Sequence, residues 1–282
     1  MDFDFAYIAR AIITNTVYQL VFTVGLIAAV GLVVGLLNRA FYSLVGYRFG
    51  RIVCMATGFI GVPVHEIGHA VFCIIFGHRI VEMKLYQPNS ADGTLGYVNH
   101  SYNRRNVYHQ IGNFFIGFGP ILFGSAVLLA MMVGLVPSLF EAFRDGSDFS
   151  EVPNLDVISL SALGHIFEVM RGASLAFFSS SDIGDWRWWL FMVPACSIAL
   201  HMSLSVPDIK SSWVGFGFIL LTLLLVNIVL FFVRIDMMLA LTNHCLVVGT
   251  FILNFLTISV VFSLILFLFG LVVMLITRLR PR

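Results

Sequence analysis

The amino-acid sequence predicts an all-α polytopic membrane protein with about six transmembrane helices and a small membrane-associated β-hairpin after the second helix. Hydrophobic residues make up 59% of the 282 residues, and charged residues only 11%, against about 25% in soluble domains. Apolar runs of about 20 residues, the length needed to cross a bilayer, recur along the whole chain. We therefore expect a single domain, residues 1–282, embedded in lipid.

Six apolar runs account for the expected membrane spans. They lie at about 11–37, 52–76, 111–136, 188–206, 213–233 and 246–276. Gly31 and Gly35 form a Gly-x-x-x-Gly pair in the first run, and we interpret such small residues as sites where helix backbones approach closely. The four cysteines lie in or beside apolar runs without any Cys-x-x-Cys pair, so we interpret them as packing residues.

Two polar stretches separate the runs. Residues 77–110 contain strand-like segments at 79–86 and 94–99 around a turn-rich sequence, which predicts a β-hairpin. Residues 137–187 hold eight acidic residues against three arginines, which predicts an extramembrane segment with a short amphipathic helix around 160–178. The formal net charge of +1 and the lack of a Lys/Arg block argue against a nucleic-acid partner.

The second apolar run carries the motif His65-Glu66-Ile67-Gly68-His69. Two histidines four residues apart project from one face of a helix, the arrangement that grips a single zinc ion. A carboxylate beside the metal can take a proton from a water molecule that zinc activates and pass it to the leaving amine. The motif therefore predicts a zinc-protease centre with His65 and His69 as ligands and Glu66 as general base; a hydrogen-bonded packing cluster is the alternative.

A catalytic zinc usually takes a third protein ligand, and Asp208 is the preferred candidate. It follows the fourth apolar run, where a carboxylate at membrane depth needs a cation or a donor; a turn aspartate after Pro207 is the alternative. His201 is the rival. On a continuous helix it would lie on the same face about 10 Å away, so the two cannot both bind one ion. We interpret His201 as a residue that supports a ligand or touches substrate, with a packing histidine as the alternative.

The order of these features resembles the site-2 protease family of intramembrane zinc metalloproteases, in the compact form without PDZ or CBS domains. In that family a helix with His-Glu-x-x-His is followed by a β-hairpin, a Gly-Pro motif that opens the next span, and an aspartate in a later span that completes the zinc site. The corresponding pieces here are the motif at 65–69, the hairpin stretch, Gly119-Pro120 and Pro207-Asp208. Together they cover about residues 52–212.

The resemblance is incomplete in the later span, where the family typically has an asparagine and a proline before an Asp-Gly pair. This chain has His201 and Pro207 before Asp208-Ile209. Asn113, shortly before the Gly-Pro motif, is a further candidate for substrate contact, with helix packing as the alternative.

The resemblance implies a zinc metalloendopeptidase with one Zn²⁺ ion that cleaves membrane-anchored protein substrates within or near the bilayer. It also implies that an edge strand of the hairpin pairs with unwound substrate by β-augmentation. We expect an integral multi-pass protein of a bacterial cytoplasmic membrane, whose partners are a transmembrane protein substrate and the lipid bilayer.

Two other functions compete with this one. In a different class of membrane metalloprotease a glutamate is the third ligand, and Glu168 is the candidate, although it belongs to a polar stretch. A non-proteolytic metal-binding scaffold or transporter is the non-enzyme alternative. The sequence does not favour a transporter, because the spans show no paired broken helices in two similar halves.

Overall fold

The computed structural model describes residues 5–90, 93–145 and 184–279, and four single positions at 168, 171, 172 and 175. Its elements are α1 (Phe5–Leu20), the π-helical segment η1 (Val21–Gly25), α2 (Leu26–Val45), α3 (Tyr47–Ile75), β1 (Arg79–Lys84), β2 (Tyr97–Ser101), α4 (Val107–Leu135), α5 (Pro137–Asp145), α7 (Trp186–His201), α8 (Val206–Val233) and α9 (Ile235–Leu279). The prediction of a helical protein with one small hairpin is confirmed. The amphipathic helix expected around 160–178 lies largely outside the described residues.

Five helical segments of the described chain are long and apolar enough to cross a membrane: 5–45, 47–75, 107–135, 207–233 and 235–277. Six spans are therefore not confirmed. The expected span at 188–206 corresponds to α7, which has 16 residues and ends at His201. Its length of about 24 Å is short of the roughly 30 Å bilayer core. The apolar run breaks there because Ser205 caps a new helix with Pro207 in its first turn.

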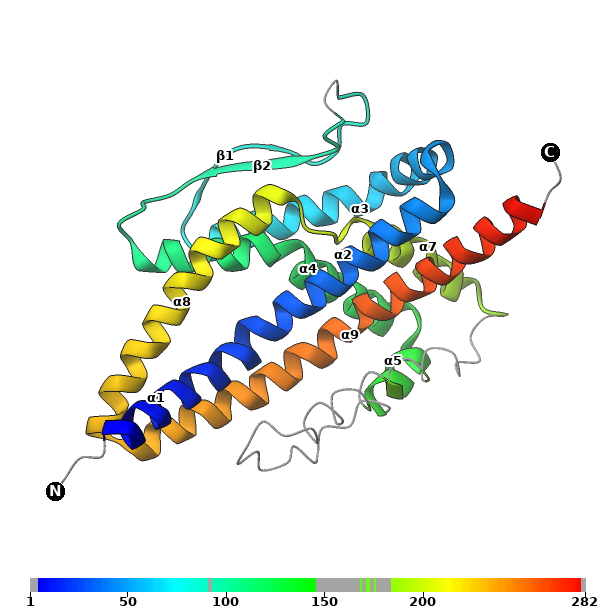
Figure 1. Cartoon of the computed structure of the whole chain (residues 1–282). Helices are drawn as coiled ribbons and strands as arrows, with labels where there is room; N and C mark the ends of the chain where they lie inside the picture. Colours follow the sequence, from blue (N-terminus) through cyan, green and yellow to red (C-terminus); the bar gives the residue numbers. More distant parts are fainter. Residues whose placement is uncertain are drawn as a thin grey trace.

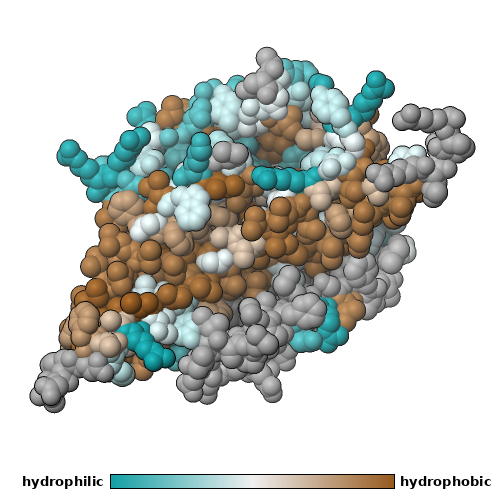
Figure 2. Space-filling model, in the orientation of Figure 1, coloured by the Kyte–Doolittle hydropathy of each residue, from teal (hydrophilic) through white to brown (hydrophobic). Residues whose placement is uncertain are grey.

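The outer surface carries a broad apolar band. Figure 2 shows this band between two more hydrophilic ends of the molecule. Many large hydrophobic side chains are exposed, and Leu32, Val233 and Phe251 are each more than half exposed. An apolar surface of this extent is unusual for a soluble monomer, and it is compatible with the predicted multi-pass membrane protein.

The helices pack as a bundle in which α2 runs alongside α9, while α3 packs against α4 and α7, and α4 packs against α8 (Figure 1). Buried polar side chains join α1, α8 and α9: the Gln19 amide donates to Asn227 Oδ1 (3.0 Å) and to Thr242 Oγ1 (2.9 Å). Such bonds hold helices together in lipid. A Cβ on Gly31 would lie 2.8 Å from a side chain of α4, whereas Gly35 faces open space. Only the first glycine of the pair is a close packing site.

The hairpin lies over α3, at the end of the bundle where α8 begins (Figure 1). β1 pairs antiparallel with β2, and the register places Ile80 opposite His100 and Lys84 opposite Tyr97. The strands are shorter than the predicted segments, but the hairpin is confirmed. This position brings it next to the residues that the sequence singled out.

Candidate metal centre

Three side chains from two distant helices meet beneath the hairpin. His65 and His69 project from α3 and Asp208 from the first turn of α8, and one ligand atom of each lies within 4.8 Å of the others. His69 Nε2 is 3.2 Å from His65 Nε2 and 3.4 Å from Asp208 Oδ1. Glu168 is exposed and pairs with Arg171 instead. The carboxylate brought to the histidines is that of Asp208.

Hydrogen bonds determine which nitrogen of each histidine carries the proton. His65 Nδ1 is 2.6 Å from the His201 carbonyl oxygen, and His69 Nδ1 is 2.7 Å from that of Ile116. A carbonyl oxygen only accepts, so each Nδ1 carries the hydrogen and donates it. Both Nε2 atoms then present lone pairs to each other and to a carboxylate oxygen. Such an arrangement is repulsive without a cation, and its nitrogen and oxygen donors fit zinc.

The two carbonyl groups are free to accept for separate backbone reasons. Pro120 lies inside α4 and has no N–H, so the Ile116 carbonyl four residues earlier lacks its helical donor. His201 is the last residue of α7, where carbonyls have no intrahelical partner. Pro120 of the Gly119-Pro120 motif thus leaves the Ile116 carbonyl free to accept the hydrogen bond that orients His69.

Close approach of α3 and α4 brings that acceptor within reach. A Cβ on Gly68 would lie 2.8 Å from the Gly119 carbonyl oxygen, and one on Gly119 would lie 2.7 Å from the Gly68 carbonyl oxygen. A larger residue at either position would force the helices apart. The glycine inside the His-Glu-x-x-His motif and the glycine before Pro120 are therefore two halves of one contact.

Asp208 has two tasks at the start of α8. Its Oδ2 accepts from the Ser205 backbone N–H (2.8 Å), and its own backbone N–H donates to Ser205 Oγ (3.3 Å), which together form a capping box. The Ser205 hydroxyl also donates to Oδ2 (2.5 Å). Its Oδ1 is directed toward His69. The two alternatives from the sequence, a helix-end aspartate and a candidate metal ligand, therefore do not exclude each other, because one carboxylate caps α8 and also approaches His69.

The placement of His201 on one helix with Asp208 is wrong, because residues 202–205 separate α7 from α8. His201 lines the cavity that opens beside His65 and His69, described below, and its Nε2 is 4.0 Å from Cys54 Sγ. Its backbone carbonyl orients His65. Asn113 is buried in α4, where its amide donates to Gln110 Oε1 (3.3 Å), and it does not line the cavity. That position fits the packing alternative.

The three side chains open into a cavity of about 640 Å³ together with Glu66. The backbone just before β2 covers this carboxylate so closely that a Cβ on Gly96 would lie 3.0 Å from Glu66 Oε1. The rest of the wall comes from β2, the α7–α8 connection and neighbouring helices: Tyr42, Cys54, Val62, Thr94, Leu95, Tyr97, Val98, Asn99, His100, Ile116, Gly117, Leu200, His201, Ser203, Ser205, Pro207 and Ser211. Burial lowers the pKa of His100, and the neighbouring His78 and His69 lower it further, to about 4. The His100 ring is therefore neutral near pH 7.

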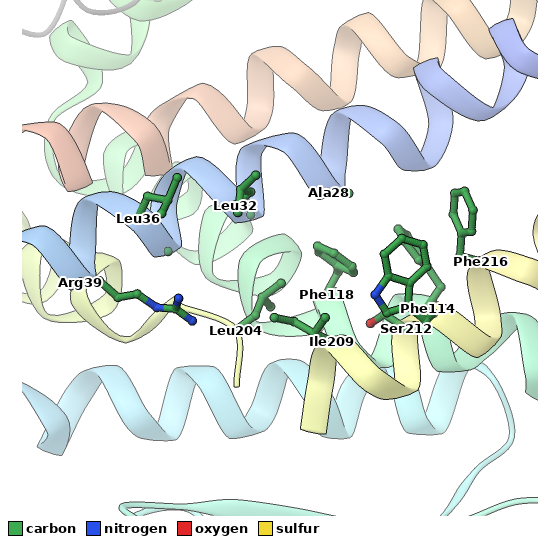
Figure 3. Close-up of a pocket in the computed structure, with 13 residues that line it drawn as sticks. Ala28, Leu32, Leu36, Arg39, Phe114, Phe118, Leu204, Ile209, Ser212 and Phe216 are labelled. Carbon is green, nitrogen blue, oxygen red and sulfur yellow. The ribbon is translucent and has the colours of Figure 1, made fainter. Parts of the chain in front are cut away.

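A second, apolar pocket of about 310 Å³ lies between α2, α4 and α8. Figure 3 shows its lining residues, which include Leu36 and Phe118. Leu204 and Ile209 line this pocket, while Ser205 and Asp208 line the 640 Å³ cavity of the candidate metal centre, called the metal cavity below. The first turn of α8 and the residues before it therefore separate the two spaces.

Over the described residues, fold and site together define a helical protein with five helical segments of membrane-spanning length and a His-His-Asp donor group beside a glutamate, in which His69 is buried and the other two donors are partly buried. The chain matches no protein-family model, no curated protein and no solved structure.

Proposed function

We propose that this chain is an intramembrane zinc metalloprotease of the site-2 protease type, which hydrolyses peptide bonds of membrane-anchored protein substrates. The observation that carries the proposal is the convergence of two Nε2 lone pairs and Asp208 Oδ1 beside Glu66. A packing cluster would not need both Nδ1 atoms held by backbone acceptors with three electron-rich atoms left facing one another.

Each residue has a distinct role in this proposal. His65, His69 and Asp208 hold one Zn²⁺ ion, and their orientation is fixed in advance by hydrogen bonds on their far sides. Zinc, when bound, polarises a carbonyl group and lowers the pKa of water. Glu66 accepts the proton of the attacking water and delivers it to the nitrogen of the leaving amine. The backbone at Gly96 limits the access of bulk water to that carboxylate.

The hairpin supplies a surface for an unwound substrate. In the described residues β2 pairs with β1 alone, and residues 94–100 line the cavity. An extended peptide can add to this edge through main-chain hydrogen bonds. Because a packed helix hides its peptide bonds, a transmembrane substrate must first unwind, and helix-breaking residues in the target should favour cleavage.

The apolar pocket suggests how a transmembrane segment reaches the site. It lies between α2 and α8 and is lined largely by hydrophobic side chains, so it suits an apolar helix arriving from the bilayer. The start of α8 lies between it and the metal cavity, beside the α4 residues 114–118 that also line the two spaces. A displacement of this segment would join the two spaces, and we propose it as the entry route.

We count α7 as the sixth membrane segment, in a bacterial cytoplasmic membrane. Its first residues include Trp186, Trp188 and Trp189, and tryptophan is enriched at membrane interfaces. Its last residue, His201, lies at the metal cavity. A helix that stops inside the bilayer is tolerated where the following backbone lines a polar cavity, as residues 203 and 205 do here.

The test is the Glu66→Gln variant with a cleavable transmembrane substrate in detergent or liposomes. We expect cleavage to fall by about 10² to 10⁴, while zinc content and helical structure stay at wild-type levels, because no metal-facing group is removed. Glu141→Gln, on the exposed face of α5, is the matched control and should cleave normally. Equal cleavage by Glu66→Gln and wild type would defeat the proposal. Zinc binding by a wild-type protein that cleaves nothing would favour the scaffold.

A further inference from the structure

A second group of metal-binding side chains lies one helical turn beyond the first. Cys73 is four residues after His69 on α3, and its Sγ lies within 4.8 Å of ligand atoms of His78 and His100. The three residues come from the last turn of α3, the connection to β1, and β2. Cys73 and His78 are buried, and His100 is partly buried.

The end of α3 fixes two of these residues by its backbone. Gly77 has φ of +69°, a conformation that glycine adopts easily. The His78 N–H donates to the Cys73 carbonyl (2.8 Å), and the Gly77 N–H donates to that of Ile74 (3.2 Å). This pair of bonds is a Schellman motif. It folds the chain back, so His78 is held near Cys73 whether or not a ligand is present.

The third residue is brought by the hairpin, and its contact with His78 defines the tautomer. His78 Nε2 is 2.9 Å from the His109 carbonyl oxygen, so Nε2 carries the hydrogen and donates it. The lone pair of His78 Nδ1 then faces His100 Nδ1 at 3.0 Å. His100 pairs with Ile80 across the sheet, so its position depends on that of the hairpin.

We infer that Cys73, His78 and His100 form a second metal site, separate from the His-His-Asp group, which takes a borderline or soft cation such as Zn²⁺. One thiolate and two imidazoles are donors that zinc prefers, and three protein ligands leave a fourth position open. Binding releases the thiol proton of Cys73 to solvent. The competing arrangement is a plain hydrogen bond from His100 Nδ1–H to His78 Nδ1 with Cys73 as a packing thiol.

Occupancy of this second site would brace the wall of the metal cavity. Residues 94–100 line that cavity, and His100 is the residue shared between the cavity wall and the second site. A metal there ties β2 to α3 from outside the reacting centre. Movements of the hairpin away from α3, which would take His100 off the metal, should therefore become rarer. At a zinc concentration about 100 times Kd they fall about 100-fold.

The test uses the purified full chain in detergent, stripped of metal and titrated with Co²⁺, because a thiolate ligand gives a sulfur-to-cobalt charge-transfer band. The wild type should bind two ions and show the band. His65→Ala should bind one ion and keep the band, since it weakens only the first site. Cys73→Ser should bind one ion without the band, and Cys196→Ser, in α7, should behave as wild type.

A further variant and a proteolysis measurement distinguish loss of metal binding from loss of the fold. His100→Gln changes a partly exposed strand residue, so it should keep the bundle intact while losing the second ion and the band. In the wild type, Zn²⁺ should slow proteolysis after the exposed Lys84 of β1, and in His100→Gln it should not. Absence of the band in wild type, or a band in Cys73→Ser equal to that of Cys196→Ser, overturns the inference. Either result leaves the proposed protease centre to its own test with Glu66→Gln.

Discussion

The contact between Gly68 and Gly119 allows a sharp test of how the site is positioned, through the variant Gly119→Ala. The added Cβ would lie 2.7 Å from the Gly68 carbonyl oxygen, whereas ordinary contacts begin at 3.4 Å. The two helices would have to separate by about 0.7 Å, since backbone atoms cannot move aside as a side chain can. That displacement stretches the bond between His69 Nδ1 and the Ile116 carbonyl, now 2.7 Å, to about 3.4 Å, beyond the usual limit of about 3.2 Å.

Loss of this hydrogen bond should loosen the orientation of His69 without removing any metal-facing atom. Groups that orient a ligand typically contribute 10- to 100-fold in metal affinity or activity, and we expect Gly119→Ala to weaken zinc binding by that factor. Overpacking also destabilises a protein by about 1–3 kcal/mol, so helical content and thermal unfolding are measured alongside. Zinc affinity is read after dialysis at controlled free zinc.

Gly134→Ala is the matched control, because it makes the same substitution in the same helix at a position where a Cβ meets no atom within 4 Å. It should bind zinc as the wild type does. If Gly119→Ala folds and holds zinc as tightly as Gly134→Ala, the account of how the α3–α4 contact orients the site is wrong.

Three further predictions concern the third ligand, the hairpin and the apolar pocket. Asp208→Ala should lower zinc occupancy sharply and should also destabilise the start of α8 by about 1 kcal/mol. His201→Ala should retain most zinc, because the backbone carbonyl that orients His65 remains. Zinc content is measured at a fixed free zinc concentration, and the reverse pattern would exchange the two roles. Val98→Pro removes a strand N–H and should impair cleavage with zinc unchanged; loss of zinc as well would make the strand structural. Gly35→Leu should fill the apolar pocket and slow cleavage in liposomes, while Gly217→Leu, also in open space, should not; equal rates would refute the entry route.

Composition and local pattern sufficed for much of this protein. The low charge and long apolar runs predict the helical class, because a chain without water as solvent must satisfy its backbone within helices. The motif at 65–69 places its two histidines on one helical face by periodicity alone, and turn residues between strand-like segments predict the hairpin. The expected span at 188–206 is not confirmed, because α7 ends at His201 and Ser205 caps the start of the next helix, an end that hydropathy alone does not reveal.

The tertiary structure decided what meets what. Asp208 is 139 residues after His69, and only the packing of α4 between α3 and α8 brings their side chains within 3.4 Å. The acceptors that orient both histidines are backbone carbonyls. Pro120 marks in the sequence that the Ile116 carbonyl lacks its helical donor, but which histidine that carbonyl meets depends on how α3 packs against α4. Cys73, an ordinary packing residue by its spacing, lies beside two histidines because the helix end and the hairpin return the chain to it. Local sequence determines the helices and the candidate ligands they carry, whereas contacts between distant segments determine which of those candidates lie close enough to share one ion.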